Sequence, residues 1–265
     1  MNNRIKNIFL TKKKKLITFI TAGDPNLDYS RKILENLPKY GVDIMEIGMP
    51  FSDPMADGPT IQLASSRAIK NKVDLNKVFN LCKNVRKTNK KTPIILMGYY
   101  NPILHFGNSK FINECKKAGV DGLIIVDLQP ENDKTLFELA RRKKIDFIRL
   151  ITPTTTEKRL KEILINASGF LYYVSITGVT GAKLKDFKKV EQSIKKIKKK
   201  TKLPIVVGFG IKTKEQVQKI FKFADGVVIG SSIVEIIEKK GIKNSKIENI
   251  LLSIKKFINV VRNQK

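Results

Sequence analysis

The feature that most constrains the fold of this chain is a regular alternation of short apolar runs with longer, lysine-rich segments. Each apolar run has the length and composition of a buried β-strand, and the segments between them repeat their apolar residues with helical spacing. Several runs are almost continuously apolar, as is typical of parallel strands covered on both faces. The eight expected strands are LITFI (16–20), DIMEI (43–47), PIILM (93–97), GLIIV (122–126), DFIRLI (146–151), FLYYV (170–174), PIVVG (204–208) and GVVIG (226–230).

The segments between these runs predict helices. Eight β/α repeats joined by right-handed crossovers predict an α/β fold, a single (β/α)8 TIM barrel, and a doubly wound open sheet is the alternative. Residues 1–265 are expected to form one domain, because no linker-like change of composition interrupts them. The expected helices cover residues 29–40, 74–87, 109–119, 131–143, 156–167, 185–200 and 214–224, with an extra N-terminal helix within 2–10 that caps the barrel bottom and a closing amphipathic helix at 244–261.

The charge balance is strongly basic, with 52 lysines and arginines against 24 acidic residues and a formal net charge of +28. Such a balance raises the possibility of nucleic-acid binding. However, only nine of these residues are arginine, the planar side chain best suited to reading bases and phosphates. The lysines are spread over the expected helices, which is typical of a solvated helix face. We therefore expect no nucleic-acid partner.

Several other classes of protein are disfavoured by composition. No run approaches the roughly 18 to 20 apolar residues of a membrane span, so we expect no membrane partner. The N-terminal segment lacks a signal-peptide cleavage pattern. Cys82 and Cys115 suggest neither a disulfide framework nor a metal site, and no other residues have ordinary metal-ligand spacing. A cytoplasmic protein without a metal is the expectation.

Two carboxylates occur where a barrel would place its chemistry, at the C-terminal ends of strands and in the loops that follow. Glu46 ends the second expected strand on the same face as Ile44, which points into the barrel. Burial among apolar neighbours raises the pKa of a carboxyl group and favours a general acid. A structural ion pair with a lysine is the alternative for Glu46.

The second carboxylate, Asp57, lies in the loop SDPMADGPT, between Pro54 and Pro59. Taken alone, Asp57 could be a turn residue or the N-cap of the next helix. Together with Glu46 it forms a pair of acids in unlike environments, one buried and protonated and the other solvated and ionised. Such a division separates acid from base roles.

The last two expected strands run into glycine-containing loops that predict an anion site. Gly210 follows strand seven, and Gly230 and Ser231 follow strand eight. Thr213 with Gln216, and Ser232 with Glu235, have the spacing of capping boxes that begin helices. Backbone amides at a helix start bind phosphate, and many barrels hold a substrate phosphate after strands seven and eight.

The stretch SITGVTGAKLKDF after strand six is rich in glycine and threonine. This composition suits a hinged lid over a substrate, and a surface loop is the alternative.

The motifs EIGMPFSDPMADGP, MGYYNP, SITGVTG, VGFGIKT and IGSSIV occur in this order and closely resemble the α subunit of tryptophan synthase. ITAGDP and IVDLQPEN also fit, and the resemblance runs from about Lys13 to the C-terminus. That family is a single barrel, in agreement with the strand count. Gln129 departs from the family, which usually has proline there, and position 176 is arginine in some members.

The resemblance implies a carbon–carbon lyase of L-tryptophan biosynthesis that cleaves indole-3-glycerol phosphate into indole and glyceraldehyde 3-phosphate. It implies that Glu46 protonates the indole ring carbon and that Asp57 stabilises positive charge at the ring N–H. The remaining implied residues are Phe19, Met97 and Tyr99 in the indole pocket, Tyr172 near the substrate, Thr180 in the lid, and Gly181, Gly210, Gly230 and Ser231 at the phosphate.

The resemblance also implies an α2β2 assembly in which indole passes through a tunnel to a β subunit. Pro50, Asp53 and Pro54 would lie at the surface that meets this partner. Pyridoxal phosphate would belong to the β subunit, and this chain would hold no cofactor. The alternative function is a catalytically weak barrel that mainly activates its β partner.

Overall fold

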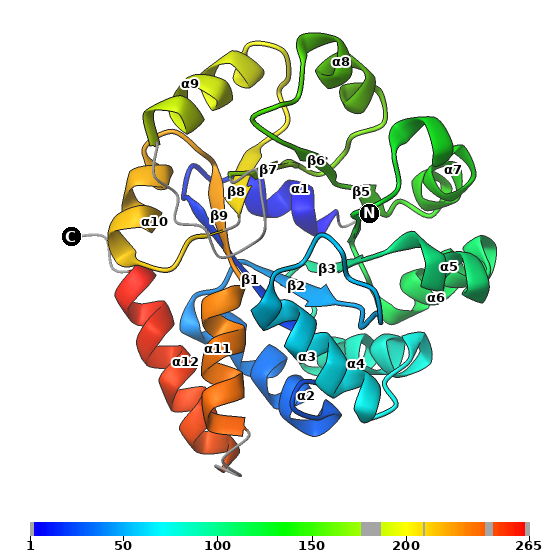
Figure 1. The fold of residues 1–265 in the computed structure, drawn as a ribbon, viewed down its shortest axis with the longest axis vertical. Coiled ribbons are helices and arrows are strands. Elements are labelled where there is room, and N and C mark those ends of the chain that lie inside the picture. Colours follow the sequence, from blue (N-terminus) through cyan, green and yellow to red (C-terminus); the bar gives the residue numbers. More distant parts are fainter. Residues whose placement is uncertain (1–2, 176–186, 209, 242–245, 263–265) are drawn as a thin grey trace.

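The computed structural model describes residues 3–175, 187–208, 210–241 and 246–262. Within them, nine parallel strands form one sheet in the order β5-β4-β3-β2-β1-β9-β8-β7-β6 (Figure 1). The strands are β1 Lys15–Thr21, β2 Ile44–Gly48, β3 Ile94–Gly98, β4 Gly122–Ile125, β5 Asp146–Phe147, β6 Arg149–Ile151, β7 Leu171–Val174, β8 Ile205–Gly208 and β9 Gly226–Ile229.

The sheet closes almost completely into a barrel, because its two outermost strands are neighbours in the chain. β5 pairs with β4 and β6 pairs with β7, and Ile148 separates them. The expected strand 146–151 is therefore divided into two short strands, each hydrogen-bonded to a different neighbour. The other seven expected strands are present, and most of their ends are shifted by one residue. The predicted (β/α) barrel is confirmed.

Helices surround the barrel and connect its strands. They are α1 Arg4–Phe9, α2 Leu27–Asn36, α3 Pro59–Lys70, α4 Leu75–Thr88, α5 Tyr100–Phe106, α6 Asn108–Ala118, α7 Lys134–Arg142, α8 Glu157–Ile165, α9 Phe187–Lys198, α10 Lys214–Phe221, α11 Ser231–Gly241 and α12 Ile247–Arg262, with 3-10 turns η1 Leu37–Tyr40 and η2 Pro130–Asn132. Among the described helices, none is long and apolar enough to cross a bilayer.

Side chains that alternate along the strands divide the core into two layers. Leu16, Ile20 and Met45 point outward into the large cluster under the helices. Ile17 and Ile44 point inward and belong to a second cluster that fills the barrel. This alternation is the direct result of the period-2 geometry of a strand.

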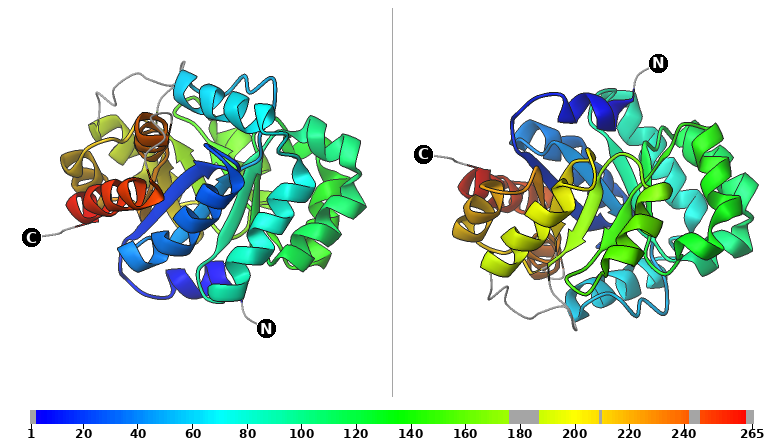
Figure 2. Two further views of the ribbon diagram at one scale, coloured as in Figure 1. Left: turned by 90° about the horizontal axis from the view of Figure 1, so that it is seen from below. Right: turned by 90° about the horizontal axis from the view of Figure 1, so that it is seen from above.

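The N-terminal helix closes one end of the barrel, as predicted. Ile5 of α1 is fully buried and belongs to the cluster inside the barrel. Asn3 caps this helix by accepting a hydrogen bond from the amide of Lys6. Figure 2 shows α1 and α3 at opposite ends of the barrel. The end near α3, where the strands finish, is therefore left for the functional site.

Candidate active site

Strand pairing places Glu46 inside the barrel. β2 lies between β1 and β3, and in this register Glu46 is beside Phe19 on one side and Ile95 on the other. Phe19 and Ile95 belong to the apolar cluster inside the barrel, as does Ile44, two residues before Glu46. The carboxyl group is thus surrounded by apolar side chains near the C-terminal end of its strand.

The surroundings of Glu46 favour its protonated form. The residue is 1% exposed, and its Oε2 atom has no hydrogen-bond partner among the described residues. Burial, with a smaller contribution from the charge of Asp57, raises the pKa of Glu46 from its ordinary 4.5 to about 8. Glu46 forms no ion pair with any described lysine, so the alternative of a structural ion pair finds no partner in this part of the chain.

Asp57 is held in place by a tyrosine that directly follows the neighbouring strand β3. The N-cap of α3 is Gly58, so Asp57 does not cap that helix. Instead the hydroxyl of Tyr99 donates a 3.1 Å hydrogen bond to Asp57 Oδ2. The expectation of a solvated Asp57 is wrong, because the residue is half-buried and burial raises its pKa to about 6, while the hydrogen bond from Tyr99 lowers it.

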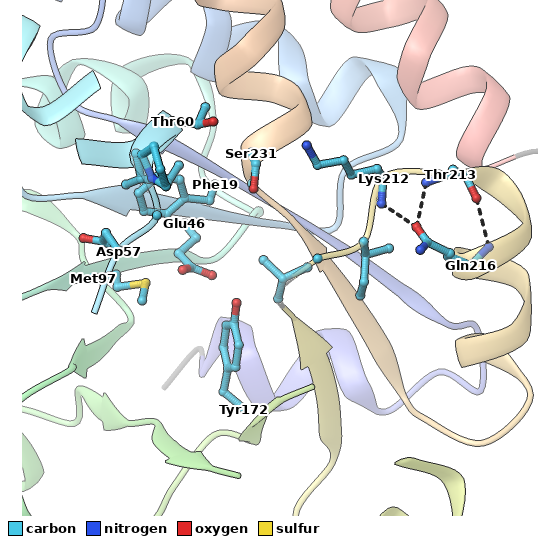
Figure 3. Close-up of a pocket in the computed structure, with 17 residues that line it drawn as sticks. Phe19, Glu46, Asp57, Thr60, Met97, Tyr172, Lys212, Thr213, Gln216 and Ser231 are labelled. Carbon is cyan, nitrogen blue, oxygen red and sulfur yellow. Dashed lines mark hydrogen bonds between the residues drawn. The ribbon is translucent and has the colours of Figure 1, made fainter. Parts of the chain in front are cut away.

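A cavity of about 450 Å³ lies at this end of the barrel and contains both carboxylates (Figure 3). It is large enough for a ligand with an aromatic ring and a phosphate tail. Most of the predicted site residues line it, namely Phe19, Glu46, Asp57, Met97, Tyr172, Gly210, Gly230 and Ser231. Tyr99 lines a small adjoining cavity and reaches the site through its contact with Asp57.

Tyr172 approaches the two acids from the opposite side of the cavity. Figure 3 shows its hydroxyl directed toward the carboxyl group of Glu46. Burial, and the charges of Glu46 and Asp57, raise the pKa of Tyr172 well above its usual range, so this hydroxyl stays protonated. Its ring lies against Gly208, where a Cβ atom would be 2.1 Å from the tyrosine oxygen. Glycine is therefore needed at position 208 to leave space for the side chain of Tyr172.

The far end of the cavity is formed by helix starts. α11 begins at Ser231, and Gly230 and Ser231 both line the cavity. Gly210 has a positive φ of 73°, which favours glycine. The capping box of Thr213 and Gln216 is present, as predicted. The amides and dipole of the first turn of α11 suit an anionic group at this end.

The second predicted capping box is wrong. Ser232 is the second residue of α11, because the helix begins two residues earlier than a cap at Ser232 predicts. The Glu235 carboxylate accepts a 2.7 Å hydrogen bond from Lys212 Nζ instead of one from the helix backbone. Gly230, which lacks a capping side chain, therefore precedes the helix, and the first-turn amides of α11 are not covered by a serine hydroxyl at position 232.

Several lining residues were not predicted, namely Gly58, Pro59, Thr60, Ile61, Ile211, Lys212, Thr213, Gln216 and Val228. The sequence does contain a signal for Lys212 as a binding residue, because it is a cation two residues after a loop glycine. Thr60 and Ile61 carried none, since they belong to α3 and face the cavity only once that helix is folded over the barrel.

Three other predicted site residues, those assigned to the partner surface, do not line this cavity. Pro50, Asp53 and Pro54 belong to the loop between β2 and α3, where Asp53 is exposed and both prolines are half-buried. Thr180 and Gly181, assigned to the lid and the phosphate site, lie outside the described residues. Among the residues that are described, no three histidine, cysteine or acidic side chains gather in a way that could hold a metal ion.

Comparisons with known proteins give a consistent result. A model of the tryptophan synthase alpha chain family matches residues 5–262. Tryptophan synthase subunit alpha from Legionella pneumophila is 35% identical, with a TM-score of 0.90 over 99% of this chain and 98% of that one. The tryptophan synthase α2β2 complex of Pyrococcus furiosus contains a chain that is 38% identical, with a TM-score of 0.85 over 94% of this chain and 97% of that one. A Mycobacterium tuberculosis tryptophan synthase structure matches at 27% identity, with a TM-score of 0.87 over 98% and 99% of the two chains.

Proposed function

The chain belongs to the tryptophan synthase alpha chain family, a family of lyases that cleave indole-3-glycerol phosphate, and we propose that Glu46 and Asp57 carry out this cleavage. The observation that supports this most directly is the shared cavity, which holds two carboxyl groups whose pKa values differ by about two units. Near neutral pH one group is mainly protonated and the other mainly ionised. Such a pair can give a proton at one point and accept a hydrogen bond at another.

The first step is protonation of the indole ring. The buried carboxyl group of Glu46 carries a proton at pH 7 and donates it to the ring carbon that bears the glycerol side chain. Positive charge then develops on the ring nitrogen. The ionised Asp57 accepts a hydrogen bond from the ring N–H and stabilises this charge, which it can do strongly because the site is largely shielded from water.

The second step breaks the carbon–carbon bond. The side-chain hydroxyl next to the ring loses its proton and becomes the aldehyde of glyceraldehyde 3-phosphate, while the bonding electrons return to the ring. The carboxylate of Glu46, which has just given up its proton, is the base for this step. One proton is gained by the ring and one is lost by the hydroxyl, so Glu46 ends in its starting state.

The remaining residues bind the substrate. Phe19 and Met97 provide apolar walls for the indole ring, and Tyr172 positions its hydroxyl beside Glu46. Gly210, Gly230 and Ser231 receive the phosphate at the start of α11. We assign Thr180 to the lid and Gly181 to the phosphate site, as the resemblance implies.

We also propose that the chain acts in an α2β2 assembly with a β subunit that holds pyridoxal phosphate. The Pyrococcus furiosus relative belongs to an α2β2 tryptophan synthase complex. Here the loop containing Pro50, Asp53 and Pro54 would meet the partner, and it connects directly to the site because the Asp57 amide donates a 2.9 Å hydrogen bond to the Pro54 carbonyl. The buried free thiols of Cys82 and Cys115 fit a reducing compartment, which we propose is the cytoplasm.

The test is release of indole from indole-3-glycerol phosphate by the purified chain, with and without the β subunit. Glu46→Gln and Asp57→Asn should each lower kcat/KM by at least about 100-fold while the circular dichroism spectrum stays unchanged. Glu248→Gln, the same change at an exposed carboxylate on α12, is the control and should keep full activity. Near-full activity in either active-site variant would show that the assignment is wrong. A wild-type chain that activates the β subunit without releasing indole would support the alternative of an activating partner.

A further inference from the structure

Lys212 is a cation at the phosphate end of the cavity, and the reaction as described above makes no use of it. It lines the same cavity as Gly230 and Ser231. Figure 3 shows its side chain extending from the start of α10 toward Ser231. About 46% of the side chain is exposed, so the ammonium group lies at the mouth of the cavity rather than in the protein interior.

The position of the ammonium group is defined by its partner. Lys212 Nζ donates a 2.7 Å hydrogen bond to Glu235 Oε1. Glu235 is four residues after Ser231 in α11, so the two side chains lie on the same face of the helix, about 6 Å apart along its axis. The positive charge of Lys212 is therefore held beside α11, against a residue of the turn that follows Ser231.

The backbone of Lys212 is also fixed. The amides of Lys212 and Thr213 both donate to Gln216 Oε1, at 2.7 and 3.1 Å. Ile211, the residue before, is buried in the core under the helices. With its neighbour anchored on one side and its own amide bonded on the other, Lys212 directs its side chain to the cavity side of the loop.

We propose that Lys212 is a charge contact for the phosphate of the substrate, and that Glu235 holds the lysine in place while the site is empty. This proposal rests on the lyase function proposed above. A phosphate monoester carries a charge of about −1.5 to −2 at pH 7. A lysine beside the helix start adds a full positive charge to the partial charge of the backbone amides, and it favours phosphorylated over unphosphorylated ligands.

A competing explanation is that Lys212 only neutralises Glu235, whose negative charge would otherwise repel the phosphate. The two explanations differ in the outcome of a double substitution. If Lys212 attracts the phosphate directly, removing Glu235 as well relieves its repulsion but does not restore wild-type binding. If Lys212 only neutralises Glu235, the double variant binds as tightly as the wild type.

The experiment compares Lys212→Gln, Glu235→Gln, the double variant and Lys214→Gln in the full chain. Lys214 is the first residue of α10 and does not line the cavity, so its variant controls for the loss of one positive charge near the site. Two measurements are made for each protein. One is the steady-state kinetics of indole-3-glycerol phosphate cleavage at low and high ionic strength, and the other is calorimetric binding of glycerol 3-phosphate.

Lys212→Gln should raise KM and the Kd of glycerol 3-phosphate about 10-fold and change kcat less than 2-fold. The salt dependence of KM should also weaken, and the double variant should remain weak. Values equal to those of Lys214→Gln, or full recovery in the double variant, would overturn the proposal.

Calorimetry separates the test of Lys212 from the test of the proposed lyase function. A wild type that binds glycerol 3-phosphate but releases no indole would refute the lyase assignment alone, and the variants would still test Lys212.

Discussion

The hydroxyl of Tyr99 connects the loop that carries Asp57 to the barrel wall. Tyr99 directly follows β3, is 4% exposed and donates a 3.1 Å hydrogen bond to Asp57 Oδ2. The hydroxyl oxygen of Tyr99 also accepts a 3.0 Å hydrogen bond from the amide of Ala56. One buried side chain thus orients both the carboxylate and the backbone next to it, which explains how a loop residue is aimed into the cavity without being part of a strand or helix.

This contact leads to a prediction for the pH profile. Asp57 must be ionised and Glu46 protonated for the first step, so kcat/KM should fall below about pH 6 and above about pH 8. The hydrogen bond from Tyr99 lowers the pKa of Asp57. In Tyr99→Phe this bond is lost, and the acidic limb should move to higher pH by about 0.5 to 1 unit.

The measurement is kcat/KM between pH 5 and 9 for the wild type and Tyr99→Phe. Tyr100→Phe is a matched control, because the hydroxyl of Tyr100 accepts a hydrogen bond from Asn108 rather than contacting Asp57. Its acidic limb should coincide with that of the wild type. An unshifted limb in Tyr99→Phe would show that the hydroxyl does not influence the ionisation of Asp57.

A second prediction concerns stability, because an acid with a raised pKa destabilises the folded state as pH rises. Between pH 4.5 and about 8 Glu46 keeps its proton in the folded chain and loses it in the unfolded chain. The free energy of unfolding should therefore fall by up to about 1.4 kcal/mol per pH unit from this group. Glu46→Gln removes this dependence.

The stability of Glu46→Gln relative to the wild type should therefore increase by about 3 kcal/mol between pH 5 and 8 and change little above that. Urea unfolding at several pH values measures this difference. The exposed Glu248→Gln variant is measured alongside, as the same substitution at a surface position. Parallel curves for the wild type and Glu46→Gln would mean that Glu46 has an ordinary pKa.

The barrel could be predicted because its signal is repeated along the chain. Each strand is a short apolar run, and burial on both faces requires the same composition every time. The division at Ile148 could not be predicted, since it depends on which neighbour each half of the strand meets when the barrel closes. Helix α3 was not among the expected helices, because its buried face carries the small residues Ala64, Ser65 and Ala68 instead of large apolar ones.

The candidate site, like the fold, could be predicted from the sequence only in part. Glu46 could be found from the sequence, because a carboxylate in an apolar strand is an exception to its local pattern. The environment of Asp57 was mispredicted, since its burial comes from Tyr99, which follows β3, and from the folding of α3 over the cavity. Lys212 was not predicted, because its place after a loop glycine is a weak signal among so many lysines, and its contact with Glu235 exists only in the folded chain.

A third prediction concerns Gly208, which leaves space for the side chain of Tyr172. A Cβ atom at this position would be 2.1 Å from the tyrosine oxygen and 2.4 Å from the ring carbon that bears it. Gly208→Ala should displace Tyr172, lower stability by about 1 to 3 kcal/mol and reduce kcat/KM at least about 10-fold. Gly107→Ala is the control. Gly107 has a positive φ of 93° with no atom near the added carbon, so it should lose about 1 kcal/mol and keep its activity. Equal activity in the two variants would contradict this role of Gly208.

The last prediction concerns Arg67, which connects the elements on either side of the cavity mouth. From α3 its guanidinium donates to both carboxylate oxygens of Asp24, at 2.7 and 3.0 Å, and to Glu238 of α11 at 2.8 Å. Asp24 is only 1% exposed, so Arg67→Met would leave a buried carboxylate without its cation. We expect a loss of about 3 to 5 kcal/mol in the free energy of unfolding.

The loss in Arg67→Met should be smaller at acidic pH. Burial is the largest influence on Asp24 and raises its pKa even with Arg67 present, and without the arginine the pKa rises further, so protonation removes the uncompensated charge as pH falls. Arg31→Met, which breaks surface ion pairs with Asp28 and Glu35, should cost no more than about 1 kcal/mol at any pH. Urea unfolding at pH 5 and 8 compares the two variants. A loss for Arg67→Met as small as that for Arg31→Met, or one independent of pH, would show that Asp24 does not depend on Arg67 for its charge.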